Sequence, residues 1–343
     1  MSAAGRAGFR LLRLDLAPAP DSPGTAGGGA ASAPSAAAEL LVPEDSPIFA
    51  GHFPGRPLLP GVAHLALLRQ VLEALAARGV LGGEAPGNTV IAEVRRFRLR
   101  REIVPGGRVE LRVQGIGAVD AAGAGGTVGE AGAQGEPGAI GSAGATGVPS
   151  GIFRFELRRQ SATGNPGKPG HPGEIASEGT VRTGIISALS PAAAPIPGPD
   201  FAPGSPCRPV ADLVPHAPPA RLLAEVLGAS AGGILCAGSI PAHHPLAAGG
   251  EVPGFLAIEL GAQAAAALEA LARHPGGPPR LGYLVGVRDA HLPARLPTGR
   301  TLRVTAVPAG HAGALAIYDM EVAEEGAAQP LAAGAISTFL TEP

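Results

Sequence analysis

The chain has 343 residues, enough for two domains of ordinary size. Its formal net charge of −2 and pI near 6.5 provide no overall basic field, which argues against a nucleic-acid-binding protein. Its two cysteines, Cys207 and Cys236, have no metal-ligand spacing and suit a reducing compartment. The N-terminus lacks the apolar core of a signal peptide, and the most apolar window, 255–272, contains Glu259, Gln263 and Glu269. We therefore expect a cytoplasmic protein without a membrane span.

In chain order, the first predicted elements are strands at 9–16 and 39–43, separated by an Ala/Pro/Gly/Ser-rich loop at 17–37. A helix is predicted from Val62 to about Arg78, ending at Gly79 as a C-terminal glycine stop should. Further strands are predicted at 89–101, 108–113, 152–158 and 174–183. One helix with a mainly antiparallel sheet indicates an α+β unit.

Low-complexity segments interrupt this unit at 115–151 and 161–173. A glycine falls at every third position from Gly129 to Gly147, but a collagen helix needs a long run in three aligned chains. Because these short tracts flank a strand, we interpret them as expanded hairpin loops. The Pro/Ala/Ser-rich residues 184–206 then form a linker between an N-terminal domain, 1–183, and a C-terminal domain, 207–343.

The second domain repeats the first. Pro60-Gly61 precedes an apolar helix, and so does Pro253-Gly254. Pro105 lies 45 residues after Pro60, and Pro297 lies 44 residues after Pro253, each at the turn before an alternating strand. We expect the two units to pack about a pseudo-two-fold axis.

The segment from Phe49 to Gly61 contains three prolines and three glycines around a single histidine, His52. This composition predicts a tightly turned loop that leads into the helix start, where backbone N–H groups lack partners. Residues 51–62, Gly-His-Phe-Pro-Gly-Arg-Pro-Leu-Leu-Pro-Gly-Val, closely resemble the signature of the 3-hydroxyacyl-acyl-carrier-protein dehydratases, which have the hotdog fold. In that family a catalytic acid falls where this chain has Ala66, and a glutamine falls at Gln70.

The second domain shows the reverse pattern, with the acid present and the histidine loop altered. Its helix start, 252–263, resembles the family's helix, with Glu259 at the acid position and Gln263 at that of the glutamine. The loop before it has lost most of the Pro/Gly pattern, and His244 is one position off the expected spacing. The family's enzymes are dimers whose sites take the histidine from one subunit and the acid from the other. The resemblance therefore implies a double hotdog with one complete site, His52 with Glu259, and an incomplete opposite site of His244 with Ala66.

The implied reaction is dehydration of a 3-hydroxyacyl group. An imidazole suits the base that removes the C2 proton, so His52 has that role. The acid, Glu259, would be kept protonated by an apolar tunnel, and the N–H of Gly61 would stabilise the thioester oxygen. The same resemblance assigns Phe53, Pro60, Gln70, Gly254 and Gln263 to substrate binding or support of the site.

A basic strand suggests the partner. Arg96, Arg98 and Arg100 alternate around apolar residues and are either a solvated face or a docking rim for an acidic acyl carrier protein. No metal or soluble cofactor is expected, because the acyl group arrives on the carrier's phosphopantetheine. Fatty-acid synthesis and a polyene-type pathway such as aryl polyene synthesis both fit. The alternatives are a hotdog acyl thioesterase and a non-catalytic acyl-binding or scaffold protein.

Overall fold

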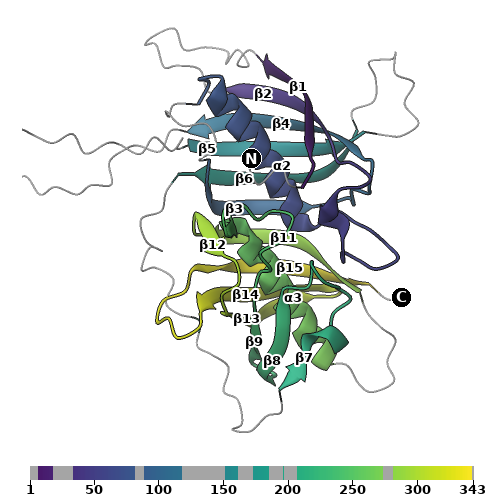
Figure 1. The fold of residues 1–343 in the computed structure, drawn as a ribbon, viewed down its shortest axis with the longest axis vertical. Coiled ribbons are helices and arrows are strands. Elements are labelled where there is room, and N and C mark those ends of the chain that lie inside the picture. Colours follow the sequence, from purple (N-terminus) through teal and green to yellow (C-terminus); the bar gives the residue numbers. More distant parts are fainter. Residues whose placement is uncertain are drawn as a thin grey trace, which may run out of the picture.

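The computed structural model describes residues 7–17, 34–81, 89–117, 151–160, 173–184, 196, 207–272 and 281–341. Most of the low-complexity tracts 17–37, 115–151 and 161–173 and of the predicted linker lies outside these residues, so its interpretation stays a prediction. Residues 35–37 and 115–117, expected in loops, belong to strands. The described parts form one large antiparallel sheet that curves around two helices (Figure 1).

The N-terminal unit consists of six strands and one long helix. Its sheet order is β1-β2-β4-β5-β6-β3, and helix α2 packs on its inner face. The elements are β1 (Arg10–Ala17), β2 (Ser35–Leu41), the 3₁₀ turn η1 (Pro47–Phe49), α2 (Gly61–Ala77), β3 (Ile91–Leu99), β4 (Arg108–Gly117), β5 (Gly151–Arg159) and β6 (Glu174–Thr183).

The C-terminal unit repeats this plan around helix α3, with the order β11-β15-β14-β13-β9-β8-β7. Strands β10 and β12 pair separately. The elements are β7 (Arg208–Pro209), η2 (Val210–Asp212), β8 (Leu223–Ser230), β9 (Gly233–Gly238), β10 (Glu251–Pro253), η3 (Gly254–Leu256), α3 (Ala257–Leu271), β11 (Leu281–His291), β12 (Arg295–Pro297), β13 (Leu302–Ala312), β14 (Leu315–Glu324) and β15 (Ala332–Thr341).

The two units share one sheet because β3 pairs with β11 in antiparallel register, with Phe97 opposite Val287. Figure 1 shows this seam at the middle of the molecule, with α2 above it and α3 below. The seam is the physical basis of the predicted pseudo-dimer, since it joins the halves by backbone hydrogen bonds.

Each helix is buried on most of its surface because the sheet wraps it. In α2, residues such as Leu65, Leu68 and Leu72 are fully buried, and the helix stops at Gly79, whose φ of +71° suits glycine. The apolar stretch Gly254–Leu271 has the length and composition of a membrane span, yet 67% of it is buried inside the protein. It occupies the position of a core helix in the C-terminal unit.

The helix starts differ between the halves. Helix α2 begins directly at Gly61, whereas α3 is preceded by the 3₁₀ turn at Gly254. A side chain at Gly254 would place its Cβ only 1.8 Å from the carbonyl oxygen of Pro293, so this turn requires glycine. Otherwise the predicted strands and helices occur within a few residues of their expected bounds.

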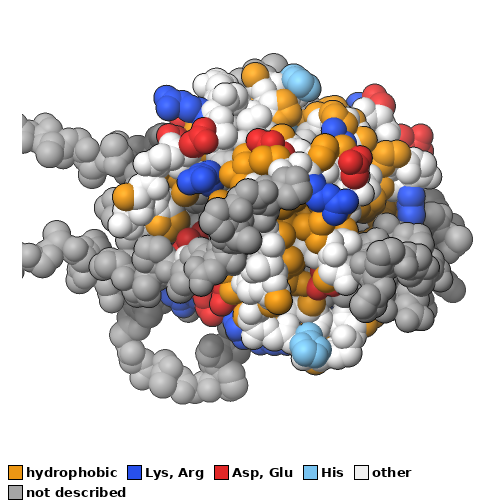
Figure 2. All heavy atoms as spheres, turned by 90° about the horizontal axis from the view of Figure 1, so that it is seen from below, with side chains coloured by type: hydrophobic (Ala, Val, Ile, Leu, Met, Phe, Trp, Pro, Cys, Tyr) orange, Lys and Arg blue, Asp and Glu red, His pale blue; other side chains and the backbone are white. Residues whose placement is uncertain are grey.

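The surface carries no dominant charge on the face seen from below. There, basic and acidic side chains are interspersed among apolar ones (Figure 2). This mixture agrees with the small net charge of the chain.

Candidate active site

His52 is fixed by its own loop. Its backbone N–H donates to the carbonyl of Phe49 at 3.1 Å, and its carbonyl accepts from the N–H of Leu58 at 2.8 Å. Its Nδ1 lies 3.0 Å from the carbonyl oxygen of Leu58, which can only accept, so Nδ1 carries the proton. The other ring nitrogen, Nε2, is therefore left with a free lone pair, as a base requires.

Glu259 lies in the first turn of α3 and is 6% exposed. Its Oε1 accepts a hydrogen bond of 3.0 Å from Nε2 of Gln263, one helical turn on. Gln263 is itself anchored, because its Oε1 accepts from the N–H of Leu222 at 2.9 Å and its Nε2 also donates to the carbonyl of Ala220 at 2.8 Å. The pair predicted from the sequence spacing is thus in contact, with Gln263 holding the carboxylate in place.

A third side chain, His216, completes the cluster. Its Nε2 lies 3.3 Å from Oε1 of Glu259, and the imidazole is almost buried. The loops of His52 and His216 are joined by a hydrogen bond of 3.0 Å from the N–H of Ala217 to the carbonyl of Gly51. Gly51 has a φ of +79° and an added Cβ would lie 2.0 Å from the oxygen of Ala217, so only glycine permits this approach.

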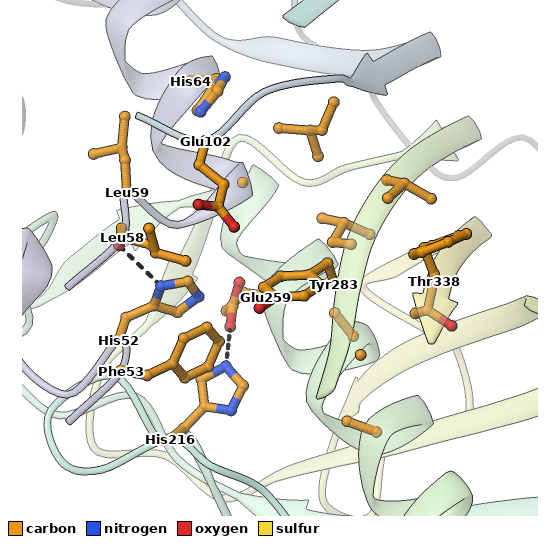
Figure 3. A pocket seen from close by; sticks show the side chains of 18 of the residues that line it. His52, Phe53, Leu58, Leu59, His64, Glu102, His216, Glu259, Tyr283 and Thr338 are labelled. Atoms are coloured by element: carbon orange, nitrogen blue, oxygen red, sulfur yellow. Dashed lines mark hydrogen bonds and ion pairs between the residues drawn. The ribbon is translucent and has the colours of Figure 1, made fainter. Parts of the chain in front are cut away.

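The three groups converge from both halves of the chain. One ring nitrogen of His52, one of His216 and a carboxylate oxygen of Glu259 all lie within 4.8 Å of one another. Figure 3 shows His52 and His216 on one side of Glu259, and Tyr283 and Thr338 on the other. Two imidazoles and a carboxylate are ligand types that Zn²⁺ accepts, so the expectation of no metal stays a prediction.

The protonation states follow from burial and these contacts. Burial lowers the pKa of His52, against the opposing charge of Glu259, so His52 is neutral near pH 7. Burial alone would raise the pKa of Glu259. The hydrogen bond and charge of His216, the charge that His52 carries when it is protonated at low pH, and the hydrogen bond of Gln263 outweigh it and lower the pKa to about 2. The expectation that an apolar tunnel keeps Glu259 protonated was therefore wrong for the unliganded site, because His216 lies against the carboxylate.

These groups open onto a cavity of about 230 Å³. Its floor is one face of α3, where the small side chains of Ala262 and Ala266 follow Glu259. Gly61, the first residue of α2, also lines it, and a Cβ at Gly61 would come within 3.1 Å of leucine side chains on β3 and β11. The lining also includes apolar residues that suit an acyl group: Phe53, Leu58, Leu59, Leu99, Leu284, Val285 and Phe339.

The remaining sequence-predicted residues divide into two groups. Phe53 lines the cavity and stacks on His52 with ring centroids 4.1 Å apart, and Pro60 directly precedes Gly61 as the N-cap of α2. Gln70 and Gly254 do not line the cavity. Gln70 donates to the carbonyl of Phe9 at 3.3 Å, and Gly254 packs against Pro293, so both support the helices from outside the site.

The opposite site, expected to be incomplete, has Ala66 in place of the acid. Ala66 is buried in the core of α2, whereas His244 lines a smaller cavity beside Glu259 and His52. The loop carrying His244 has lost the Pro/Gly pattern of the His52 loop. It leads through β10 and η3 into α3, whereas the His52 loop leads directly into α2. His244 therefore belongs to the surroundings of the His52–Glu259 site.

The cavity reaches solvent near charged residues. Arg100, Arg101 and Glu102 line it, and Arg100 is paired with Glu178 at 2.5 Å. Arg56, in the His52 loop, donates to the hydroxyl of Tyr283 at 2.9 Å and to Glu102 at 3.0 Å, which bridges the two halves at the rim. No role for Arg56, Tyr283 or His216 was predicted from the sequence. The available signal for His216 was the segment Pro215-His216, which resembles part of the dehydratase sequence.

Comparisons with known protein families match both halves. The model described as ApeI-like, ApeI dehydratase, matches residues 30–120, and the model described as ApeP-like, ApeP dehydratase, matches residues 208–342. Two curated relatives are 3-hydroxyacyl-[acyl-carrier-protein] dehydratases named FabZ, from Anaeromyxobacter sp. and Haemophilus influenzae. They are 38% and 40% identical over 72 residues, which is 20% of this chain and 46% and 47% of theirs. The chain spans about half the length of the curated relatives it matches.

Solved structures with the same fold include a bifunctional dehydratase-cyclase domain from ambruticin biosynthesis, with a TM-score of 0.52, 16% identity and coverage of 95% of both chains. The dehydratase domain of the polyketide PpsC from Mycobacterium tuberculosis matches with a TM-score of 0.52 and 12% identity, over 90% of this chain and 94% of that one. At such identities the likeness concerns the fold alone. It confirms that the chain is a double hotdog.

Proposed function

We propose that this double hotdog, with an ApeI-like first half and an ApeP-like second half, dehydrates 3-hydroxyacyl groups carried on an acyl carrier protein to trans-2-enoyl groups. The observation that carries the proposal is the meeting of His52 from the first half with Glu259 from the second at the end of one apolar cavity. The relatives named FabZ support the same reaction class. We also propose a cytoplasmic location and no metal or soluble cofactor.

In the proposed reaction, Nε2 of His52 removes the proton from C2 of the thioester. The hydrogen bond from Nδ1 to Leu58 keeps the ring in the required tautomer and orientation. Burial keeps the pKa of His52 low, so the ring is neutral and ready to accept a proton near pH 7.

The C3 hydroxyl departs on the Glu259 side. A C2–C3 double bond forms as the C3–O bond breaks, and the hydroxyl takes one proton to leave as water. Because Glu259 is ionised, we propose that this proton comes from His216 in its imidazolium form, through the contact of 3.3 Å, and passes over the carboxylate, which leaves His216 as a neutral imidazole. The proton gained by His52 later restores the lost one, so the enzyme ends unchanged.

Charge that develops on the thioester oxygen needs a donor. The first N–H groups of a helix have no intrahelical partner, and Gly61 is the first residue of α2 and lines the cavity. We propose the N–H of Gly61 as that donor, helped by the positive end of the helix dipole.

The central test is an assay of the purified chain with a 3-hydroxyacyl carrier protein and detection of the enoyl product by mass spectrometry. We expect His52→Ala to reduce kcat by roughly 10³-fold, within the range for loss of a general base. His216→Phe should raise the pKa of Glu259, because it removes the contacts that lower it, and so should change the acid limb of the pH profile. Wild-type turnover that survives His52→Ala would refute the assignment.

Two alternatives are separated by the same assay. A hotdog thioesterase would release the free acid, whereas a dehydratase keeps the thioester and loses water. A non-catalytic acyl-binding protein would bind the substrate without forming either product. Addition of EDTA tests the proposed absence of a metal, since activity that falls on chelation and returns with Zn²⁺ would contradict it.

The proposed carrier protein needs a basic surface. Arg96 and Arg98 are exposed on β3, and neither forms an ion pair within the described part of the chain, whereas Arg100 is already paired with Glu178. We therefore propose that Arg96 and Arg98 contribute more than Arg100 to docking an acidic partner.

Charge reversal tests this docking surface. The double variant Arg96→Glu/Arg98→Glu should raise KM for carrier-bound substrate several-fold and leave KM for a small thioester unchanged. Arg303→Glu, at an exposed position of β13 in the same large sheet, is the matched control. Equal changes of KM for both substrates would exclude a docking role.

A further inference from the structure

A second, much smaller cavity lies against the same two catalytic side chains. Its volume is about 20 Å³, and His52 and Glu259 line it as well as the larger cavity. Its walls are otherwise mostly apolar, including Ile48, Val62 and Leu256. Besides His52 and Glu259, the polar side chain that lines it is that of His244.

His244 is held rigidly beside this cavity. Its carbonyl accepts from the N–H of Ala247 at 2.8 Å, and its N–H donates to the carbonyl of Pro241 at 2.9 Å. Its Nδ1 accepts a hydrogen bond of 3.2 Å from the N–H of Leu246. Burial lowers the pKa of His244 to about 4, so the ring is neutral near pH 7. A neutral imidazole whose Nδ1 accepts must carry its proton on Nε2.

The carboxylate offers a matching acceptor. The contacts from Gln263 and His216 both fall on Oε1 of Glu259. Among the hydrogen bonds and ion pairs of the described residues, none falls on Oε2. Oε2 is therefore available to accept a hydrogen bond from a further partner.

The size of the small cavity limits that partner to one molecule of water. A cavity needs about 10–15 Å³ to hold a water, and the water needs two to four polar partners. This cavity is large enough, and the polar side chains of His244, Glu259 and His52 line it. A larger ligand would not fit.

We propose that the small cavity binds one water, which accepts a hydrogen bond from Nε2 of His244 and donates one to Glu259. His244 is then a positioning residue that acts on Glu259 through this water, and it is not the remnant of a second active site. The water holds the carboxylate of Glu259 from the side of the small cavity, so its side toward the larger cavity remains free to meet the substrate hydroxyl. The catalytic consequence rests on the proposed dehydratase function, whereas the water site does not.

The first measurement is a high-resolution crystal structure of the whole wild-type chain. We expect an ordered water within hydrogen-bond distance of His244 Nε2 and a carboxylate oxygen of Glu259. An empty small cavity at a resolution where other buried waters are visible would overturn the proposal, even if the chain dehydrates 3-hydroxyacyl groups. A bound water in a chain without dehydratase activity would instead overturn the proposed function alone.

The second measurement compares two variants of similar size. His244→Met removes the donor and should lower kcat for dehydration about tenfold with KM within twofold, the scale of one lost hydrogen bond. His244→Gln keeps an N–H donor and should recover most of the loss. Thermal melting monitors folding of both variants. Full activity in His244→Met, or equal losses in the two variants when both are folded, would overturn the role of the water.

Discussion

Helices α2 and α3 occupy equivalent positions in the two halves, yet they carry different side chains at the positions that matter for the site. From Pro60-Gly61 and Pro253-Gly254 onward, the two helices can be aligned position by position. In α3 the face toward the cavity carries Glu259, Ala262 and Ala266. The corresponding positions in α2 are Ala66, Arg69 and Glu73, which are buried.

Arg69 and Glu73 form an ion pair of 2.8 Å, with each side chain 10% exposed. Where α3 has two alanines beside the cavity, α2 has two long, buried side chains at the equivalent positions. Helix α2 therefore lacks both the acid, at Ala66, and the small side chains that line the cavity on α3. The complete site thus depends on both halves, and the equivalent positions of α2 contribute to packing.

The strongest test of this asymmetry moves the acid from α3 to α2. We expect Glu259→Ala to lower kcat by roughly 10³-fold, and Glu259→Ala/Ala66→Glu to restore none of it, because His244 lines a cavity with Glu259 and not with position 66. Steady-state assays of both variants check this result. Recovery of activity in the double variant would mean that the second half-site is still usable.

The buried ion pair gives the largest expected effect on stability. Glu73→Ala should lower the free energy of unfolding by about 3–5 kcal/mol, because it leaves a buried guanidinium without its partner. Arg69→Met/Glu73→Leu should be close to neutral, since both charges are replaced by apolar groups. Urea denaturation measures both.

The matched control is the exposed pair of Arg112 and Glu110, whose removal should cost about 1 kcal/mol or less. A loss as small for Glu73→Ala as for Glu110→Ala would show that the space around α2 is open to water.

The two helices also differ at His64 in α2, whose equivalent in α3 is Ala257, and a pH experiment tests this difference. Burial lowers the pKa of His64 to about 3 from an ordinary value of 6.5. Below pH 6.5, His64 binds a proton in the unfolded chain but stays neutral in the folded chain. The free energy of unfolding therefore falls as the pH drops toward 3. We expect His64→Leu to reduce the loss of unfolding free energy between pH 7 and 4 by about 3 kcal/mol.

Denaturant titrations at the two pH values measure this difference, and the exposed His311, changed to Leu, serves as control. An unchanged pH dependence in His64→Leu would show that His64 is protonated in the folded chain. The hydrogen bond of His64 to Ser177, at 2.9 Å, is lost in the variant at both pH values and so cancels in the comparison.

The smallest expected effect concerns the acyl space above α3. Ala266→Leu narrows the cavity and should raise KM for a long acyl substrate about tenfold, with little change for a short one. Ala270→Leu, on the same helix but not in the cavity lining, is the control. Equal effects on short and long substrates would place the acyl group elsewhere.

Most of the fold could be predicted because local patterns and the internal repeat agree. The Pro/Gly loop at His52 and the aligned positions of Glu259 and Gln263 indicated the principal pair, which the structure brings together. Each of these residues lies in a short motif within one segment of the chain, so the sequence could reveal them. His216 was missed because its role depends on a contact between loops more than 160 residues apart, 217 with 51.

The charge state of Glu259 could not be predicted for the same reason. An apolar setting raises a carboxyl pKa, but the approach of His216 reverses the sign. The burial of Arg69 and Glu73 could not be predicted either, since an Arg–Glu pair at (i, i+4) spacing is common on exposed helix faces. Only the packing of the sheet around α2 makes them a buried pair.

The antiparallel seam between β3 and β11 has a consequence for stoichiometry. If the halves were separate proteins, each could also pair with a copy of itself. A pair of first halves would hold two histidines without the acid, and a pair of second halves would hold the acid without His52. Covalent connection fixes the ratio of the two halves at one to one and makes their pairing intramolecular. Free subunits would need a concentration of about a millimolar to pair equally well. Every folded chain therefore contains one complementary pair, whatever its abundance.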